Sequence, residues 1–354
     1  MKRPEPIPFA STDNRRAATG PPKAGWAEAQ PAAGRSRGVA PMLRKPKYSS
    51  QWDLFGRAIA ADRPALAGLL FIVLIVLVSL TIPIFSPFDP TAPVDAPRLA
   101  PPMTPGHPLG VDSHQRDVLT RLLWGGRISL LSGVVPTAAA TLVSLALGSA
   151  AAYFGGLPET LILRGMDILF AFPSVLLAIA IAGALGPNER NQMLAIAIVL
   201  TPYITRVVHD SVRGIKVMPY IEATRSLGAS APAILGRHVW PNALPPVIVY
   251  CTTLIGMMMV LSSGLSFLGL GVQPPTPDWG AMVRDAKDVL GVAPWLSIFP
   301  GLMILLTALA FNYLGDGFTD ALDPHKRGLK ASLLRRSPGG PDVADFEEVR
   351  AHSA

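Results

Sequence analysis

The sequence predicts an all-α membrane protein with six transmembrane helices and with both termini in the cytoplasm. Half of its 354 residues are hydrophobic and only 16% are charged, whereas about a quarter of a typical soluble domain is charged. Six stretches are poor in charged residues, and a helix needs roughly 20 apolar residues to cross a bilayer core. Because backbone facing lipid must satisfy its own hydrogen bonds, we expect these stretches to be helices.

The spans follow from these stretches in chain order. The first is free of Asp, Glu, Lys and Arg, and the second is rich in the small residues of closely packed membrane helices. In the third we expect a kink at Pro173. The fourth begins near Asn191 and runs toward His209, with Arg206 near its inner end. The six predicted spans lie within residues 64–88, 128–152, 168–187, 191–209, 246–270 and 295–315.

The orientation of the spans is predicted from the basic residues, which concentrate on the cytoplasmic side of membrane proteins. With the N-terminus inside, the four inner segments carry 24 of the 31 Lys and Arg residues. These segments are residues 1–63, 153–164, 206–237 and 316–354. Tryptophans favour water interfaces, and five fall at predicted span ends: Trp52, Trp124, Trp240, Trp279 and Trp295.

The domain organisation follows from composition and from the spans. The first residues are rich in Pro, Ala, Gly and Arg and lack an apolar run, so we expect a disordered cytoplasmic tail. An interfacial helix is expected to lead into the first span. The predicted parts are the tail 1–49, the interfacial helix 50–63, the first span with a long periplasmic loop 64–125, a five-span core 126–315 and a cytoplasmic C-terminal tail 316–354.

Signals of catalysis and of cofactor binding are missing from the sequence. Cys251 is the only cysteine, which excludes an internal disulfide framework. The six histidines show no His-x-x-x-His spacing, and no lysine follows a glycine as it would in a phosphate-binding loop. We therefore expect no catalytic residues, no cofactor, no metal and no ATP site in this chain.

Ionisable residues are scarce within the predicted spans. The nearest candidates are Arg164 and Asp167, which we place at the inner entrance of the third span. They lie one helical turn apart, so we interpret them as an interfacial ion pair rather than as a transport relay. An ion-coupled secondary transporter, which would carry mid-membrane ionisable residues and often two similar halves, is the less favoured alternative.

A polar segment at residues 220–241 stands between apolar runs. Pro219 suits the first turn of a helix that we expect over residues 220–227. Glu222 then lies near the helix N-terminus, where a carboxylate is favoured. Gly228 tolerates the left-handed conformation common just past a helix end, so we predict a reversal at Gly228 and Ala229.

A second short helix is expected to follow, with Ser230 as its cap and Pro232 in its first turn. Three prolines, Pro241, Pro245 and Pro246, are expected to end it before the fifth span. Its apolar stripe consists of Ile234, Leu235, His238 and Val239. Antiparallel helices need a link of only about 2–8 residues, and the stripe needs a partner. A channel or a structural subunit would not need such a hairpin, so we predict a docking surface in the loop 214–245.

The pattern Glu222-Ala223-Thr224, Gly228 and Trp240-Pro241 resembles the cytoplasmic EAA loop of permease subunits in bacterial ATP-binding-cassette (ABC) importers. Over residues 60–327 the chain resembles the second permease subunit of dipeptide, oligopeptide and nickel importers. It departs from the family pattern at Thr224, Trp240 and Gln115. The matching pieces occur in the family's order, at residues 89–90, 107–112, 116–121, 126–130, 152–156, 167–173, 266–280, 312–317 and 320–324.

This resemblance implies a type I ABC importer permease fold in the bacterial inner membrane. It also implies a heterodimer with a homologous permease, two ATPase subunits and a periplasmic solute-binding protein as partners, and no nucleic acid. The outer segment 86–127 is expected to help contact the binding protein. Peptides are the first choice of substrate, while nickel chelates, opines, glutathione-like peptides and peptide antibiotics remain open. The implied ATPase-coupling residues are Glu222, Ala223, Gly228, Ala229, Ser230, Ile234, Leu235 and Pro241.

Overall fold

A computed structural model describes residues 62–322, which are helical except for turns and loops. The predicted tail 1–49, nearly all of the interfacial helix 50–63, and residues 323–354 of the C-terminal tail lie outside this range. The long helices are α2 (Arg63–Phe85), α3 (Val118–Phe154), α6 (Glu189–Lys216), α9 (Trp240–Phe267) and α11 (Trp295–Leu322); the shorter ones are α4 (Gly156–Phe170), α5 (Ser174–Leu185), α7 (Pro219–Ser226), α8 (Ala231–Ile234) and α10 (Trp279–Ala286). The all-α membrane fold is therefore confirmed.

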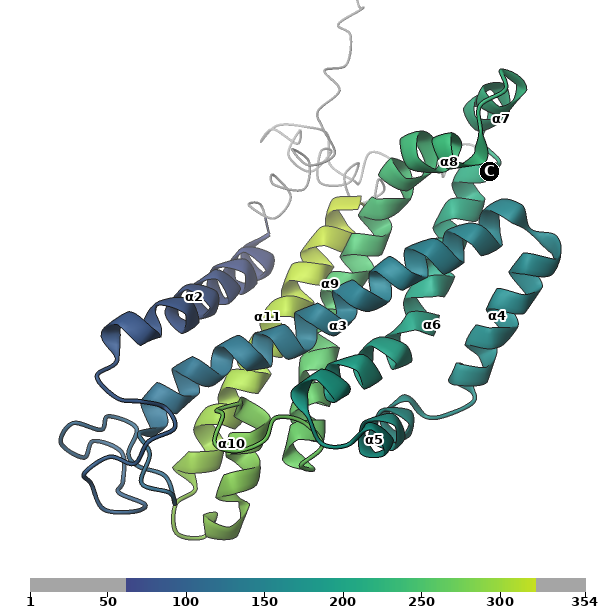
Figure 1. Ribbon diagram of the computed structural model, residues 1–354. Coiled ribbons are helices and arrows are strands. Elements are labelled where there is room, and N and C mark those ends of the chain that lie inside the picture. Colours follow the sequence, from purple (N-terminus) through teal and green to yellow (C-terminus); the bar gives the residue numbers. More distant parts are fainter. Residues whose placement is uncertain (1–61, 323–354) are drawn as a thin grey trace, which may run out of the picture. The chain divides into compact units, whose positions relative to one another are not determined.

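The number of spans depends on how α4 and α5 are counted. Within the described residues, five helical segments are long and apolar enough to cross a membrane by themselves, and α4 with α5 makes a sixth if the pair is one broken span. The two helices meet at an angle of 89° across a break of three residues (Figure 1). The predicted third segment is therefore two helices joined at a sharp bend, rather than a single kinked helix within 168–187.

A proline and a pair of glycines determine where α4 begins and ends, and both ends differ from the predicted boundaries. Pro173 disfavours a helical conformation at the residue before it and itself stands at the N-cap of α5. At the beginning of α4, Gly155 and Gly156 have φ values of 69° and 60° and turn the chain directly from α3 into α4. The loop predicted at 153–164 is thus mostly helix, and Asp167 lies eleven residues inside α4 rather than at its entrance.

Three other spans are longer than predicted. The helix α3 starts ten residues before residue 128, because the Asp117 carboxylate caps it by accepting a 2.7 Å hydrogen bond from the Thr120 amide. The helix α6 continues to Lys216, so Arg206 stands ten residues before its end. The helix α11 runs to Leu322, seven residues past the predicted end of the core.

The long helices pack around two clusters of buried apolar side chains. One joins α6 and α9 with part of α3, and the other joins α2, α3, α10 and α11. The short helix α10 presses closely on α9, since a Cβ atom on Gly280 would lie 2.4 Å from the Ser263 carbonyl oxygen. Trp279, predicted at a water interface, is instead buried in the second cluster, where its indole N–H donates to the Leu122 carbonyl at 2.8 Å.

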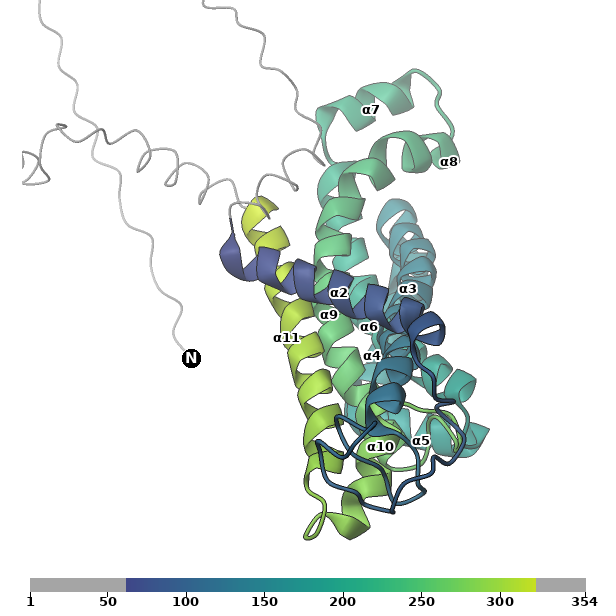
Figure 2. The same ribbon diagram turned by 90° about the vertical axis from the view of Figure 1, so that its left-hand side faces the viewer.

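The described residues have two distinct ends. The helices α7 and α8 lie at one end, together with the last turns of α11, while α10 and the loop 86–117 lie at the other (Figures 1 and 2). This arrangement puts the loop 214–245 and the end of the last span on one side, as the predicted topology requires. The assignment of that side to the cytoplasm stays a prediction from the basic residues.

Candidate functional site: the hairpin between α6 and α9

The hairpin predicted at residues 220–241 is present between α6 and α9. The helix α7 begins at Pro219, as expected, and Glu222 stands in its first turn. The second arm consists of α8 and a π-helical turn, η1 (Leu235–Val239), which leads directly into α9. The hairpin projects from one end of the helices (Figure 2).

The reversal at Gly228 is confirmed. Its φ of +83° is left-handed, and its amide donates to the Arg225 carbonyl at 2.9 Å. The following amide, of Ala229, donates back to Thr224 at 3.3 Å. These bonds satisfy the carbonyls at the end of α7, as in the common glycine-ended helix.

Two predicted details of the second arm are wrong. Ser230 occupies the N-cap of α8, but its side chain makes no capping hydrogen bond. The prolines do not end the helix before the fifth span: Pro241 lies in the first turn of α9, and Pro245 and Pro246 lie inside it. Residues Ala231–Phe267 form one continuous helical segment, so Pro241 lies within it, just after the π-helical turn η1. A π-helical turn is a common local irregularity where the regular hydrogen-bond ladder is interrupted.

The apolar stripe of the second arm packs into the protein's own core. Ile234 and Val239 are fully buried, and Leu235 packs against the same cluster. Ile221 of α7 joins them from the other arm. The stripe therefore holds the hairpin together, and the prediction that it needs an external partner is wrong. Helical spacing shows that a face is apolar, but only tertiary packing decides whether the chain's own residues cover that face.

The other predicted coupling residues remain on the surface. Ala229 is half-buried beneath the turn, whereas the rest are exposed: Glu222, Ala223, Gly228, Ser230 and Pro241. Sequence reasoning missed an exposed apolar group at the same end, of which Leu227 at the tip is 89% exposed. Val217, Met218 and Tyr220 are exposed at the opposite end of α7, where the hairpin leaves α6. A leucine directly before the turn glycine was the available signal, because a tip residue has nothing of its own chain to pack on.

The hairpin is held to the C-terminal end of α3 through Tyr153. The Lys216 ammonium donates to the Ala152 carbonyl at 3.1 Å and lies 5.9 Å from the Tyr153 ring centre. The Arg225 guanidinium of α7 stands 5.5 Å from the same ring. Cation–π contacts of this kind add to the buried stripe, so a force on the hairpin acts on α3 and α6 as well.

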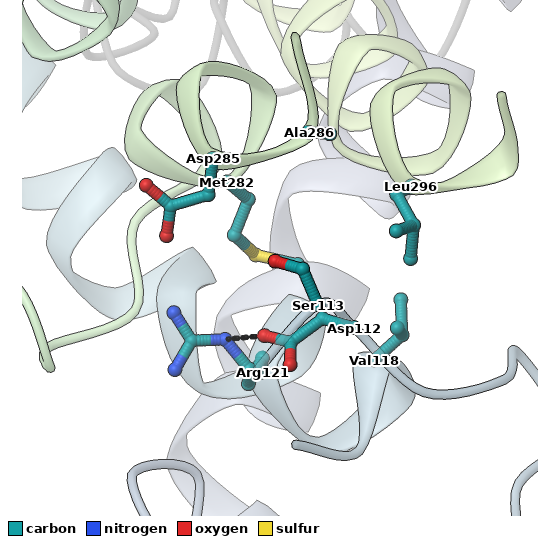
Figure 3. A pocket seen from close by; sticks show the side chains of 8 residues that line it. All are labelled: Asp112, Ser113, Val118, Arg121, Met282, Asp285, Ala286 and Leu296. Atoms are coloured by element: carbon teal, nitrogen blue, oxygen red, sulfur yellow. Dashed lines mark ion pairs between the residues drawn. The ribbon is translucent and has the colours of Figure 1, made fainter. Parts of the chain in front are cut away.

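At the opposite end, an ion-pair cluster fastens the loop 86–117 to α10. The Arg116 guanidinium contacts Asp112 at 2.7 Å and Asp285 of α10 at 3.5 Å. Figure 3 shows the third ion pair, in which Arg121 contacts Asp112 at 3.6 Å. The cavity beside them has a volume of about 20 Å³, enough for one water molecule but not for a solute. The cluster therefore has a structural role and holds the loop 86–117 against α10.

The Asp278 carboxylate stabilises the same end of the protein by capping α10. It accepts hydrogen bonds from the Ser129 hydroxyl at 2.7 Å and from the Ala281 amide at 3.1 Å. Burial raises the pKa of this carboxyl above its ordinary value of 3.8, against the lowering effect of those two donors. His107 and Asp117, also buried, pair at 2.8 Å within the outer loop.

Between α4 and α6 lies a third polar group. Arg164 and Asp167 pair at 3.7 Å, as predicted, but Asp167 also pairs with the guanidinium of Arg206. Toward the Gly156 end of α4, the Glu159 carboxylate contacts His209 at 2.9 Å and Arg213 at 3.7 Å. Sequence reasoning missed the contacts across to α6 because they join residues about forty to fifty positions apart.

Two family models match this chain. Residues 144–328, just over half of the chain, match the family described as "Binding-protein-dependent transport system inner membrane component". Residues 50–102 match the "N-terminal TM domain of oligopeptide transport permease C". Among solved structures, the inward-facing MetNI methionine ABC transporter covers 57% of this chain and 97% of its own, with 16% identity and a TM-score of 0.46.

Curated relatives match over almost their whole length. The glutathione transport system permease protein GsiD of Pectobacterium atrosepticum is 39% identical over 284 residues, which are 80% of this chain and 94% of the relative. The GsiD protein of Escherichia coli O6:K15:H31 is 39% identical over 288 residues, or 81% and 95% of the two chains. The chain belongs to the family of inner-membrane components of binding-protein-dependent transport systems and is a multi-pass permease subunit of an ABC importer.

Proposed function

We propose that this permease translocates small peptides, delivered by a periplasmic binding protein, across the inner membrane. The observation that carries the proposal is the 39% identity to glutathione permeases over four-fifths of the chain. Glutathione is a tripeptide-like solute, and a match to the membrane domain of an oligopeptide permease points to the same class. Nickel chelates, opines and peptide antibiotics are the alternative cargoes of the same machinery.

The driving force is proposed to enter through the hairpin. Two ATPase subunits would dock on the permease pair, and the surface offered here combines Glu222 with the exposed apolar tip at Leu227. Closure of the ATPases would then push on a rigid unit, because Ile221, Ile234 and Val239 are fully buried between its arms and the spans. This permease contributes no chemistry of its own in that scheme.

The remaining partners are a homologous permease and the binding protein. The binding protein is proposed to contact the outer end, where the loop 86–117 is fastened by Arg116 to Asp285 of α10. A firmly held loop suits a docking role, since little conformational entropy is then lost on binding. The homologous permease would complete the path that a single subunit leaves open.

The decisive experiment is to purify the cognate binding protein and identify its bound ligand by mass spectrometry. The ligand is then added to proteoliposomes that contain the complete importer, and its uptake is measured with ATP supplied either inside or outside the vesicles. We expect ATP-dependent uptake of a di-, tri- or oligopeptide. Uptake by the permease pair without ATPases, driven by an ion gradient, would overturn the importer mechanism, and a non-peptide ligand would overturn the proposed cargo.

A further inference from the structure

An arginine of α3 binds the backbone of α2 instead of an acidic side chain. The Arg127 Nε–H donates to the Ser79 carbonyl, and the Nη2 group donates to the neighbouring Leu80 carbonyl at 2.9 Å. Among residues 62–322, Arg127 takes part in no ion pair. Ionisable residues in membrane helices usually pair with one another or with backbone carbonyls, and Arg127 is of the second kind.

The sequence of α2 explains why its backbone needs a donor at this point. In a regular helix the carbonyl of residue i accepts a hydrogen bond from the N–H of residue i+4. Four residues after Ser79 stands Pro83, and a proline has no N–H. The Ser79 carbonyl therefore lacks its regular partner in α2, and the Arg127 guanidinium supplies the missing donor. A proline inside a membrane helix is tolerated when a neighbouring helix satisfies the freed backbone group.

Close packing of α2 on α3 makes this contact possible. A Cβ atom on Gly126 would lie 2.4 Å from the Ser79 hydroxyl oxygen, and Ser79 is buried. On the same helix as Arg127, the Trp124 ring has its centre 4.6 Å from the guanidinium carbon. The face of an aromatic ring attracts a cation, so Trp124 helps to hold the guanidinium in place.

Two further contacts bind the chain that follows α2 to the start of α3. The Ser86 and Thr120 hydroxyls lie 2.9 Å apart. The Arg121 guanidinium donates to the Pro90 carbonyl at 2.7 Å. Both contacts lie just beyond the end of α2, so the position of the loop 86–117 depends on how that end is held.

We propose that Arg127 is a positioning residue for import: its guanidinium replaces the N–H that Pro83 lacks and so fixes the end of the first span, with the start of the loop 86–117, against α3. This loop is the proposed contact of the binding protein, so the functional part of the inference rests on the proposed function. In this role Arg127 acts through the loop and needs no contact with the solute. A planar guanidinium suits the task because it donates to two neighbouring carbonyls at once, whereas a lysine ammonium is a single point charge.

The first test is a double-mutant cycle in the complete importer, read by amide hydrogen exchange at the end of α2. The Ser86 amide donates to the Ile82 carbonyl at 2.8 Å. In Arg127→Leu its exchange should become at least about tenfold faster, as for loss of a hydrogen bond from a charged group. Pro83→Ala restores a backbone N–H for the Ser79 carbonyl. Added to Arg127→Leu, it should return the exchange rate to within about threefold of the wild-type rate, because the two substitutions act on one carbonyl.

Single variants complete the cycle. Pro83→Ala alone should not speed up exchange, because Arg127 still donates to the Ser79 carbonyl. Arg127→Lys should be intermediate, and it serves for the same comparison with Pro83→Ala if the leucine variant does not assemble. The matched control is Arg98→Leu, which removes an exposed charge from the loop 86–117 and should leave exchange unchanged. Additive effects of the substitutions at positions 83 and 127 would overturn the proposed role of Arg127.

The second test measures the response of the importer to its binding protein in proteoliposomes. Arg127→Leu should raise the binding-protein concentration for half-maximal stimulation of ATP hydrolysis at least about threefold, because fewer importers hold the loop in the competent position. Hydrolysis without binding protein should stay unchanged, whereas a general loss of stability would lower both rates. Adding Pro83→Ala should restore the wild-type concentration.

The outcomes separate the role of Arg127 from the function on which it rests. If the binding protein does not stimulate the wild-type importer, the proposed function fails, while the exchange cycle still decides whether Arg127 holds α2. If stimulation occurs but Arg127→Leu matches the wild type, or loses basal hydrolysis in proportion, Arg127 has no positioning role. The same conclusion follows if Pro83→Ala does not suppress the defect, or if Arg98→Leu is impaired as strongly as Arg127→Leu.

Discussion

Replacement of Gly228 by valine tests whether the hairpin turn is needed for coupling. The backbone at Gly228 has a φ of +83°, and a Cβ atom built there would meet nothing within 4 Å. The free-energy cost of valine at this position therefore comes from the backbone conformation and not from a clash with neighbouring atoms. A left-handed conformation costs an L-residue roughly 1–2 kcal/mol, and it is least tolerated by β-branched residues.

That cost is large for a single turn. A loss of about 1–2 kcal/mol shifts an equilibrium by a factor of about 5–30, so Gly228→Val raises the ratio of distorted to native tips by that factor. The membrane spans do not depend on this turn, and insertion should be normal. We expect ATPase subunits to co-purify poorly with the variant or to hydrolyse ATP without solute uptake.

The matched control is Gly228→Asn, which adds a side chain of similar size but tolerates the left-handed region far better. Uptake and ATP hydrolysis are measured side by side in proteoliposomes for both variants. The asparagine variant should retain most of the uptake. Wild-type uptake by the valine variant would refute the coupling role, and equal impairment of both variants would show that bulk at the tip matters rather than backbone strain.

Three further predictions concern the tip and the outer end. Leu227→Glu should leave thermal stability unchanged, since Leu227 is 89% exposed. It should weaken ATPase co-purification at least about tenfold, because the buried core of an interface is depleted of charged residues; unchanged co-purification would exclude the tip from the interface. Asp278→Asn should keep the cap on Ala281 but reduce the pH dependence of thermal unfolding. Because burial raises the pKa of Asp278, this carboxyl makes the wild-type stability fall as pH rises from 3.8 through the raised value, and the variant should lack that contribution. Gly280→Ala should cost roughly 1–3 kcal/mol of stability by clashing with the Ser263 carbonyl 2.4 Å away, whereas Gly264→Ala, with open space around it, should not.

The parts of the fold that sequence predicted well are those with one-dimensional signals. The apolar runs located all the long helices, and the pair Pro219 and Gly228 marked the start and the reversal of the hairpin. Helix ends were less accurate, because caps such as Asp117 extend a helix through residues that are not apolar. Pro173 predicts the bend before α5. The helix α4 is not predicted, because most of it lies in the segment 153–164, which the sequence places between spans.

The sequence predicts where the candidate site lies in the chain, but not which of its side chains are exposed. Its residues were placed correctly in one hairpin, yet Ile234 and Leu235 face the core while Leu227 faces outward. A helical stripe has the same spacing whether it packs inside its own chain or against a partner. The second contact of Asp167, with Arg206, was equally beyond sequence reasoning because α4 and α6 meet only after folding.

Sequence by itself determined that this chain crosses the membrane repeatedly, that it belongs with importer permeases, and that a polar hairpin interrupts its later spans. Local composition and short motifs are enough for those conclusions, because transfer to lipid and helix capping depend on neighbouring residues. Only the tertiary structure decided which faces are covered and which charges meet, as with Trp279 in the core and Asp167 beside Arg206. Such contacts depend on helix rotation and approach, which no local stretch of sequence specifies.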